Sequence, residues 1–563
     1  MRLMLRCAVL ALAAAALASC TPAGSRLSPA PAPAPAPVRD TPAPVSAESL
    51  RASLFAIADD SMGGRDTGSP GDSAAVQWVA AAFARDGLVP AGENGTWFQA
   101  VGLWRIGLDS ASGLDVGGVH LAAGRDVAPV GFAMTWKAAS VPTLFAGTLD
   151  DSTTWPTAEQ SAGKLLLFRP AADGNLRAAF RAVVALRRQP RFAHAAGFAY
   201  TGLENLPADA RRETVRDRVT ADTLMFSLVR GTLLMTTEAA SALLGEPFAH
   251  AAPGRVGQSV TGSVAFRRAP LSVRNVVGVL PGSDPALRAT YVSLTAHHDH
   301  IGIALPPLDH DSARAFNRVV RPMGADSPPR EPTPEEAARI AALRDSLRRA
   351  HPARRDSVYN GADDDGSGTA ALVELARVLA AGPRPRRSIL FVSHAAEERG
   401  LSGSGWFTDH PTVPRDSIVA ELDMDMVGRG DAADLPGGGA GYIELVGSRR
   451  LSTEFGDLID SVAAREPLPF HINYEYDAPN HPLQYYCRAD HFSYARYGIP
   501  SVSLSTGEHL DYHQVTDEAQ YLDYPKLARV TALVRDVALA VANLEHRPAL
   551  NGPRPDPRAP CRQ

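Results

Sequence analysis

Five short segments of the chain are rich in histidine and carboxylate side chains. They are His297-His298-Asp299-His300, the acidic run 363–365, the pair Glu397-Glu398, the stretch 423–425 and the stretch 507–513. Histidine and carboxylate without thiolate suit a catalytic zinc site, in which water fills the open coordination positions. Two such ions lie about 3.5–4 Å apart and need one carboxylate to bridge them. The segments together contain enough ligands of the right kinds for such a pair, although a Glu-Glu pair alone is usually a solvated surface.

Most of these segments follow apolar runs that have the character of β-strands. The apolar runs cover residues 291–296, 389–392, 418–419 and 499–504. The run 360–366 instead precedes an amphipathic helix, which ends at Gly382-Pro383. From Asn275 onward, apolar strands alternate with helices, which is typical of a mostly parallel α/β sheet that binds ligands at the carboxyl ends of its strands. We therefore expect an α/β fold, with a mostly parallel or mixed sheet flanked by helices.

The acidic run also fits the spacing of an EF-hand calcium loop over residues 363–374. Two features argue against calcium. Gly361 is unfavourable in a helix that would enter the loop, and the residues from Thr369 onward continue as an amphipathic helix. The sequence contains no second EF-hand to pair with this one. The metal-bridging interpretation of the run is therefore favoured.

Motifs of other hydrolases are absent from the sequence. His-Glu-x-x-His does not occur, and no helical pattern surrounds His509 and His513. The run 400–404 reads Gly-Leu-Ser-Gly-Ser, so it lacks the final glycine of a Gly-x-Ser-x-Gly nucleophile turn. Neither a helix-borne mononuclear zinc protease nor a serine hydrolase has support here.

Bulk composition limits the classes of partner. The chain has 563 residues, more than one hydrophobic core usually organises, with 45% hydrophobic and 21% charged residues. Its formal net charge of −5, without a long basic run, offers no field for nucleic acid. We expect two or more domains and no nucleic-acid partner.

The N-terminus predicts export. Arg2 and Arg6 precede an apolar run that is too short to span a bilayer and is typical of a signal peptide over residues 1–19. The run ends in Leu-Ala-Ser-Cys20, which resembles a bacterial lipobox, and a Pro/Ala-rich tether occupies 20–45. We expect lipid on Cys20, so that the protein is anchored at the bacterial cell envelope (periplasm or cell surface) by acyl chains alone. A plain signal peptide is the alternative.

Cysteine is scarce. Removal of the signal peptide removes Cys7, and modification of Cys20 leaves only Cys487 and Cys561. A zinc site built on cysteine is therefore excluded. An oxidising compartment permits a disulfide between the two, which the sequence alone does not show.

Together, the segments resemble the co-catalytic di-zinc aminopeptidases, a family typified by bacterial leucyl aminopeptidases. The resemblance covers residues 50–541 and rests on the strings AHHDH, NGADDDGSGTAAL, HAAEERGLSGS, ELDMDMVG, ADHFSYARYGIPSV and DYHQVTDE. Through AGKLLLFRP and AAGFAY, the middle of the chain resembles, more loosely, a protease-associated domain. The resemblance implies a zinc-exopeptidase-like fold, two Zn²⁺ ions per chain, and removal of N-terminal residues from peptides that have a free N-terminus.

The domain organisation that we expect combines these patterns. A di-zinc peptidase domain is expected over 46–105 plus 268–547, a protease-associated-like domain over 106–267, and a Pro-rich tail over 548–563. Within the smaller domain, strands are expected at 164–168, 197–200 and 224–229, and a helix at 176–186. An insertion over 303–358, with a charged helix at 335–349, lies between two ligand segments, so we expect it near the mouth of the site.

The resemblance assigns five metal ligands. It gives His297 and Asp423 to one zinc, Glu398 and His513 to the other, and Asp364 to both as the bridge. This set is complete, which argues against a glutaminyl cyclase, because cyclases work with one zinc. A carboxypeptidase on the same scaffold remains an alternative.

The resemblance also implies roles around the ligands. Glu397 would be the general base that takes a proton from water and delivers it to the leaving amine. Asp299 would orient His297, because residues two apart on a strand point the same way, whereas His298 points to the other face and is expected to pack. Tyr486 is a candidate for stabilising the tetrahedral intermediate. With Glu397 and the ligands intact, a non-catalytic binding protein is the less favoured hypothesis.

Overall fold

The computed structural model describes residues 43–130, 135–171, 174–221, 231–435 and 437–563. The expected signal peptide, Cys20 and most of the tether lie outside the described residues, as does the strand expected at 224–229. Among the described helices, none combines the length and the apolar character needed to cross a membrane.

The main sheet has nine strands in the order β1-β14-β18-β15-β19-β22-β20-β21, and β2 pairs with β14. Its strands are β1 (Val89–Pro90), β2 (Phe98–Val101), β14 (Val273–Leu280), β15 (Tyr291–His297), β18 (Ser388–His394), β19 (Ile418–Met424), β20 (Tyr442–Val446), β21 (His471–Asn473) and β22 (Ser501–Ser505). The four central strands β18, β15, β19 and β22 run parallel, whereas β14 and β20 join them antiparallel. The sheet is thus mixed with a parallel centre, as the sequence predicted.

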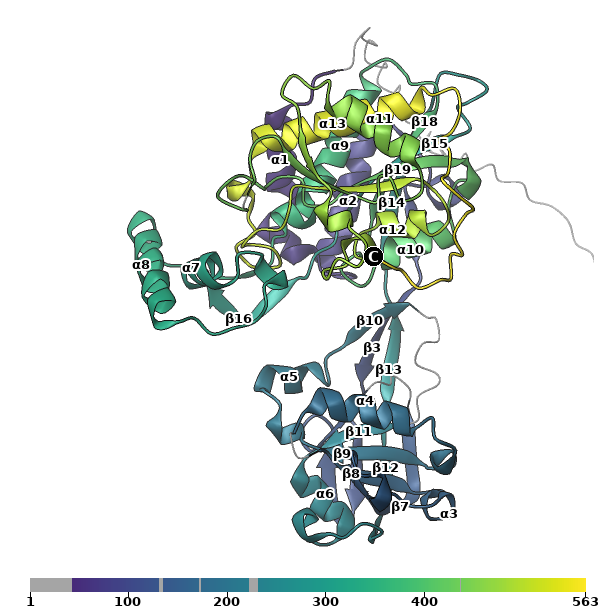
Figure 1. The fold of residues 1–563 in the computed structure, drawn as a ribbon, viewed down its shortest axis with the longest axis vertical. Coiled ribbons are helices and arrows are strands. Elements are labelled where there is room, and N and C mark those ends of the chain that lie inside the picture. The colour runs from purple at the N-terminus through teal and green to yellow at the C-terminus, as the bar shows by residue number, and fades with distance from the viewer. Residues whose placement is uncertain (1–42, 131–134, 172–173, 222–230, 436) are drawn as a thin grey trace, which may run out of the picture. The chain divides into compact units, whose positions relative to one another are not determined.

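Helices cover both faces of this sheet (Figure 1). The helices α1 (Ala47–Ile57), α2 (Pro70–Arg85), α9 (Gly368–Ala380), α11 (Thr453–Ala463) and α13 (Tyr524–Ala542) share one core with it. In β18, Ile389 and Phe391 point into that core, whereas Leu390 and Val392 point into a second core with Phe407 of α10 (Ser402–Asp409). Side chains alternate along a strand, so a strand buried on both faces reads as a continuous apolar run.

A second sheet of eight strands, in the order β5-β4-β12-β7-β8-β9-β11-β6, has cores of its own. Its strands are β4 (Gly113–Val116), β5 (Val119–Ala122), β6 (Val127–Pro129), β7 (Trp136–Thr148), β8 (Leu165–Arg169), β9 (Gly197–Thr201), β11 (Thr232–Met235) and β12 (Val256–Val264). The helices along this stretch are α3 (Ala158–Ser161), α4 (Leu176–Leu186), α5 (Ala208–Glu213) and α6 (Thr237–Leu244). The strands β8 and β9 and the helix α4 lie where the sequence predicted them.

A three-stranded sheet joins β10 (Arg218–Ala221), β3 (Leu103–Leu108) and β13 (Phe266–Pro270). All its pairs are antiparallel, with β3 in the middle. The boundaries expected at 105/106 and 267/268 fall inside β3 and β13. The chain therefore enters and leaves the middle region through neighbouring strands of one small sheet.

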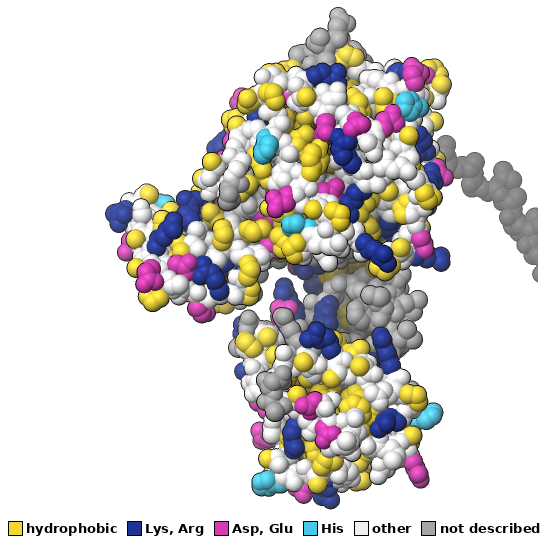
Figure 2. All heavy atoms as spheres, in the orientation of Figure 1, with side chains coloured by type: hydrophobic (Ala, Val, Ile, Leu, Met, Phe, Trp, Pro, Cys, Tyr) yellow, Lys and Arg dark blue, Asp and Glu magenta, His cyan; other side chains and the backbone are white. Residues whose placement is uncertain are grey.

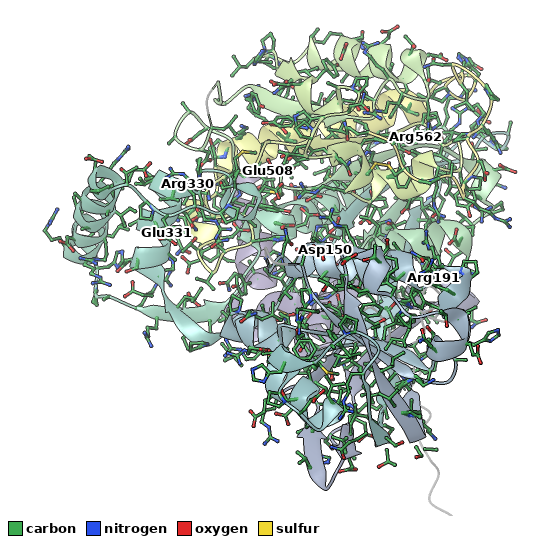
Figure 3. All side chains as sticks on the ribbon, turned by 60° about the horizontal axis from the view of Figure 1, so that its bottom comes forward. Asp150, Arg191, Arg330, Glu331, Glu508 and Arg562 are labelled. Carbon is green, nitrogen blue, oxygen red and sulfur yellow. A yellow bond between two sulfur atoms is a disulfide. The ribbon has the colours of Figure 1, made fainter. Side chains whose placement is uncertain are left out.

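The insertion contains β16 (Ile303–Asp309), α7 (His310–Val320), α8 (Pro334–Ala350) and β17 (Arg355–Val358), and β16 pairs antiparallel with β17. The helix α8, expected at 335–349, buries none of its residues, and basic and acidic side chains are mixed on the surface of this segment (Figure 2). Arg330, labelled in Figure 3, pairs with Glu336 in the first turn of α8 at 2.7 Å (Nη1 to Oε2). In contrast, Arg314 of α7 contacts Asp511 at 3.0 Å (Nη1 to Oδ2), so α7 packs on the loop that carries His513.

Candidate metal centre

The carboxyl ends of the parallel strands bring the predicted segments together. The strand β15 ends at His297, β18 ends three residues before Glu397, and β19 ends one residue before Asp425. The loop with His513 follows β22, and Asp364 lies just before α9. Because parallel strands end at one edge of a sheet, side chains from distant segments meet there.

One group of potential ligands contains His300, Asp364, Glu398 and His513. His513 Nε2 lies 2.9 Å from Asp364 Oδ2 and 3.0 Å from Glu398 Oε1. His300 Nδ1 lies 2.8 Å from the same Glu398 oxygen. Four ligand atoms thus converge on one point. His300 received no role from the sequence, although it ends the AHHDH string, and its side chain is fully buried.

A second group contains His297, Asp365 and Asp425. His297 Nε2 lies 3.7 Å from Asp425 Oδ1 and 3.3 Å from Asp364 Oδ1. Asp365 is the least suited to a metal, since its carboxylate accepts hydrogen bonds from the backbone N–H groups of His297 (3.1 Å) and Gly368 (2.9 Å). Asp364 faces His297 with one oxygen and His513 with the other, which is the geometry of a bridging carboxylate.

Asp423, which the sequence analysis expected beside His297, has other partners. Its Oδ1 accepts from the Thr295 hydroxyl at 2.9 Å, and its Oδ2 accepts from the His491 N–H at 3.3 Å. The reason is its position: Asp423 is still inside β19, paired on both sides, whereas Asp425 lies beyond the last residue of the strand. The structure therefore brings Asp425, rather than Asp423, to the first metal group.

Several buried oxygens in this centre lack a hydrogen bond. Among the described residues, Asp364 Oδ2, Glu398 Oε1 and Asp425 Oδ1 make no hydrogen bond of good geometry, and their close contacts are to histidine nitrogens, which can bind either a proton or a metal. An unsatisfied carboxylate oxygen is costly to bury unless a cation binds it. The imidazoles and carboxylates of the two groups are nitrogen and oxygen donors that suit zinc. The residues therefore fit a pair of metal ions.

The electrostatics of the histidines point the same way. Burial disfavours the charged imidazole of His513, but the carboxylates of Asp364 and Glu398 outweigh it and raise its pKa to about 11. Burial is likewise outweighed at His297, where Asp299, Asp364 and Asp425 raise the pKa well above the ordinary value. The carboxylates around His297 and His513 thus stabilise positive charge in this centre, and either protons or metal ions can supply that charge.

Glu397 lies beside these groups without joining either. Its Oε2 is 3.9 Å from His297 Nε2, and its backbone N–H donates to Asp299 Oδ1 at 3.0 Å. Burial raises the pKa of Glu397 well above its ordinary range; Asp425, Asp490 and Glu398 add to this, while His297 opposes it. A carboxylate with a raised pKa that faces the cavity suits a residue that accepts a proton and later returns it.

Asp299 lies beside His297, and its backbone carbonyl is nearer to the imidazole than its carboxylate is. His297 Nδ1 lies 3.1 Å from the backbone carbonyl of Asp299 and 3.6 Å from its carboxylate. The carboxylate of Asp299 also accepts from the Thr67 hydroxyl at 3.0 Å. His298 points away and its Nδ1 contacts Ser393 Oγ at 2.8 Å. Asp299 thus positions both His297 and the backbone of Glu397.

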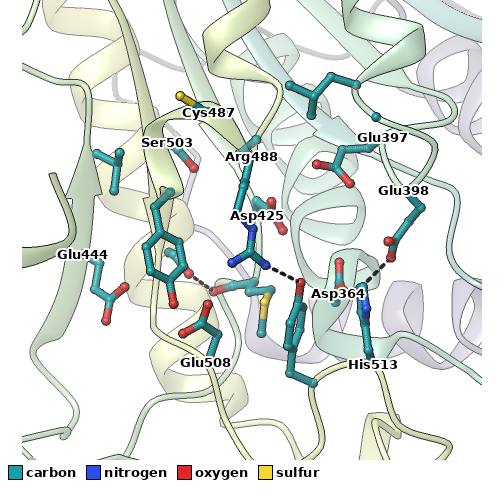
Figure 4. A pocket seen from close by; sticks show the side chains of 18 residues that line it. Asp364, Glu397, Glu398, Asp425, Glu444, Cys487, Arg488, Ser503, Glu508 and His513 are labelled. Atoms are coloured by element: carbon teal, nitrogen blue, oxygen red, sulfur yellow. Dashed lines mark hydrogen bonds and ion pairs between the residues drawn. The ribbon is translucent and has the colours of Figure 1, made fainter. Parts of the chain in front are cut away.

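A cavity of about 350 Å³ opens onto the metal groups (Figure 4). Its lining includes Asp364, Glu397, Glu398, Asp425 and His513, together with Gly400, Leu401, Met426, Glu444, Val446, Tyr485, Cys487, Arg488, Ala489, Ser503, Ser505, Glu508 and Tyr512. In Figure 4, Glu398 and His513 lie at one side of the cavity, and Glu444 and Glu508 lie at the other. The cavity is thus continuous from the candidate metal ligands to a second acidic wall.

Tyr486 is not among the residues that line this cavity. Its side chain is buried, its ring lies under the guanidinium of Arg450 at 3.9 Å, and it packs edge-on against His491. Tyr512 lines the cavity instead, stacks on the ring of His513 and accepts a hydrogen bond from Arg488 Nη2 at 3.1 Å. The sequence analysis missed Tyr512, whose signal was its place directly before His513.

A disulfide joins Cys487, in the wall of the cavity, to Cys561 near the C-terminus. The same tail is held by Gln563, whose side-chain oxygen accepts from the Tyr486 N–H at 2.9 Å. The sequence permitted this bond without showing it. The Pro-rich tail therefore fastens the cavity wall over a separation of 74 residues.

Comparisons with known proteins agree with this geometry. Residues 275–538 match the model of peptidase family M28, and this range contains both candidate metal groups. Aminopeptidase NAALADL1 of Mus musculus is 55% identical over 78 residues, which are 13% of this chain and 10% of that protein. Leucine aminopeptidase 1 of Paracoccidioides brasiliensis is 33% identical over 196 residues, 32% of this chain and 47% of that protein. The matches thus span from a tenth to about half of these relatives.

Among solved structures, an aminopeptidase from Aneurinibacillus sp. strain AM-1 aligns over 90% of this chain and 95% of its own, with a TM-score of 0.45 and 16% identity. The family match itself covers the segment in which the strand ends, the ligand groups and the cavity occur. The segment 275–538 of this chain, just under half of its length, therefore matches peptidase family M28.

Proposed function

We propose that this protein is a metallo-aminopeptidase that holds two Zn²⁺ ions and removes N-terminal residues from peptides. The observation that carries the proposal is Asp364, whose Oδ1 lies 3.3 Å from His297 and whose Oδ2 lies 2.9 Å from His513. We assign His297 and Asp425 to one metal and Glu398 and His513 to the other, with Asp364 as the bridge. Bound zinc would supply Lewis-acid activation of water at neutral pH.

The protein's own groups would carry the proton transfers and the positioning. Glu397 would take a proton from the attacking water and pass it to the leaving amine, as its raised pKa allows. Asp299 would fix the position of the His297 imidazole through its backbone carbonyl and that of the Glu397 backbone through its carboxylate. We assign the stabilisation of the oxyanion of the tetrahedral intermediate to the Tyr512 hydroxyl, in place of Tyr486, because Tyr512 lines the cavity beside His513 and Tyr486 does not line it.

The charges around the cavity favour a free α-amine over a free carboxylate as the recognised end. Glu397 and Asp425 can accept hydrogen bonds from an ammonium group beside the metals. A carboxypeptidase would need an available cation, but Arg488, the arginine in the lining, already donates to Asp326 at 2.6 Å (Nη1 to Oδ2). This balance supports an aminopeptidase over the carboxypeptidase alternative.

The test is a panel of aminoacyl arylamides and their N-acetylated forms, assayed with and without a chelator. We expect hydrolysis only of the free-amine forms, loss of activity with the chelator, and recovery on adding zinc. Asp364→Asn should lower the occupancy of both metals, because the bridge serves both. Cleavage of the N-acetylated forms would exclude the aminopeptidase, and full activity with one metal per chain would favour a cyclase-like centre.

We also propose that the chain is exported and anchored by lipid on Cys20. The lipobox-like end of the signal peptide supports the anchor, and the Cys487–Cys561 disulfide is typical of oxidising compartments outside the cytosol. The domain boundaries proposed for the chain remain 46–105 plus 268–547, with a protease-associated-like domain at 106–267. Cys20→Ser should release the protein from membranes, and a variant that still sediments with membranes after a carbonate wash would exclude the anchor.

A further inference from the structure

The wall of the cavity opposite the metal groups carries two carboxylates, Glu444 and Glu508. Glu444 belongs to β20, where it lies opposite Ser505 of the antiparallel neighbour β22. Side chains two apart on a strand share a face, so Val446 of β20 and Ser503 of β22 line the same cavity. The short serine side chains leave space in front of the carboxylates.

Glu444 is held in place but its charge is not neutralised by an ion pair. It is 4% exposed, and the Tyr442 hydroxyl donates to its Oε1 at 2.6 Å. Lys526, the lysine whose charge acts on Glu444, donates its own hydrogen bond to the Gly430 carbonyl at 2.7 Å. Within the described ranges, neither Glu444 nor Glu508 forms an ion pair with lysine, arginine or histidine.

The arginine in the cavity wall does not form an ion pair with Glu444 or Glu508 either. Arg488 donates to Asp326 at 2.6 Å and to the Tyr512 hydroxyl at 3.1 Å, so a carboxylate from the insertion already balances its charge. Two carboxylates thus face the cavity without an ion-pair partner among the described residues, although the charge of Arg488 acts on Glu508 at longer range. Buried carboxylates without a partner are costly, and a cation that enters the cavity would offset this cost.

We propose, on the basis of the aminopeptidase function proposed above, that Glu444 and Glu508 select peptides whose first residue is lysine or arginine. The α-amine of such a peptide must stay beside the metals, next to the bond that is cut. Glu444 and Glu508 lie on the side of the cavity away from Glu398 and His513, where the first side chain would extend (Figure 4). An ammonium or guanidinium group offers three or five donors to the two carboxylates and the serine hydroxyls.

The pKa values of the two carboxyls agree with a site that lacks its cation. Burial raises the pKa of Glu444 to about 7, and Tyr442 and Lys526 only partly oppose it. Burial also raises the pKa of Glu508 to about 8; a hydrogen bond with Tyr485 and the charge of Arg488 oppose this rise, while repulsion from Asp326 and Glu444 adds to it. A bound cation would favour the ionised form of both.

The experiment compares arginine with citrulline, its uncharged near-isostere, at the first position of an arylamide substrate, using the full-length zinc-loaded protein. We expect the ratio of kcat/KM for arginine over citrulline to exceed about 100-fold in the unmodified protein, because each of the two carboxylates contributes about tenfold or more. Glu444→Gln and Glu508→Gln should each lower that ratio by roughly 10-fold to 100-fold, the worth of a charged hydrogen bond. Zinc content and melting temperature report whether each variant is intact. Glu508 is less buried than Glu444, so Glu508→Gln decides the matter if Glu444→Gln does not fold.

The matched control is Glu159→Gln, which removes an exposed carboxylate outside the cavity lining and should leave the ratio unchanged. Equal rates for arginine and citrulline substrates would overturn the inference while leaving the aminopeptidase intact. An equal loss for both substrates in the Gln variants would also overturn it, because it would show that the carboxylates are only structural. Failure to cleave any free-amine substrate would instead refute the proposed function, and this inference with it.

Discussion

The neighbours Glu397 and Glu398 should respond differently when each carboxylate becomes an amide. Glu398 Oε1 lies 2.8 Å from His300 Nδ1 and 3.0 Å from His513 Nε2, so it belongs to one of the two candidate metal groups. Glu397 contributes no atom to either group, and its backbone is held by Asp299. Glu397→Gln should therefore keep the zinc content and lose the base, whereas Glu398→Gln should lose zinc.

The size of the effect follows from the role of Glu397. General acid–base catalysis typically contributes about 10²–10⁴-fold, which corresponds to about 3–5 kcal/mol of barrier. The loss in Glu397→Gln should appear in kcat, with substrate binding affected less. In Glu398→Gln the activity should fall together with the zinc stoichiometry.

The assay is zinc content by elemental analysis together with kcat for each variant, with Glu475→Gln as a carboxylate-to-amide control at an exposed position. If Glu397→Gln loses zinc while Glu398→Gln keeps it, the two roles must be exchanged. If Glu397→Gln keeps both zinc and near-normal kcat, the proton-transfer role is refuted.

Three further perturbations test other parts of the structure. The pKa values of Glu444 and Glu508 are raised to about 7 and about 8, so both carboxyls become ionised as the pH rises through this range. The preference for arginine over citrulline should therefore grow between pH 6 and 9 and vanish below pH 6. Cys561→Ser removes a disulfide that spans 74 residues. Loop entropy predicts that the free energy of unfolding falls by about 4 kcal/mol, which denaturant unfolding under oxidising conditions would measure. Arg314→Ala removes one of the two arginines that pair with the buried Asp511, so we expect the free energy of unfolding to fall by about 1–3 kcal/mol. The loop that carries His513 should then be less well positioned, and the affinity for zinc should fall.

Each of these has an outcome that contradicts it. A selectivity ratio that stays flat with pH would show that Glu444 and Glu508 do not act through charge. Unchanged stability of Cys561→Ser relative to the parent protein would mean that the tail does not restrain the cavity wall. If Arg314→Ala binds zinc as tightly as the unmodified protein, α7 does not support the His513 loop.

Local patterns in the sequence were sufficient for the elements and for most of the centre. The apolar runs of β15, β18 and β19 are buried on both faces. A continuous apolar run of this kind predicts a central parallel strand from the sequence alone. A histidine or carboxylate placed just past such a strand must lie at the ligand-binding edge. These positions indicated the segments, the family resemblance selected His297, Asp364, Glu398 and His513 within them, and the four side chains lie close together in the structure.

Only the tertiary structure decided between residues that the local pattern leaves equivalent. Asp423 and Asp425 share one face at the period of a strand, and what separates them is where the ladder with β15 and β22 ends. Tyr486 and Tyr512 come from loops whose packing depends on Arg450 and Arg488, residues that no short motif connects to them. Contacts between distant segments likewise create the pair Glu444 and Glu508, the disulfide, and the place of His300 in one candidate metal group. The direction of a side chain beyond the end of a strand depends on the residues that pack against it.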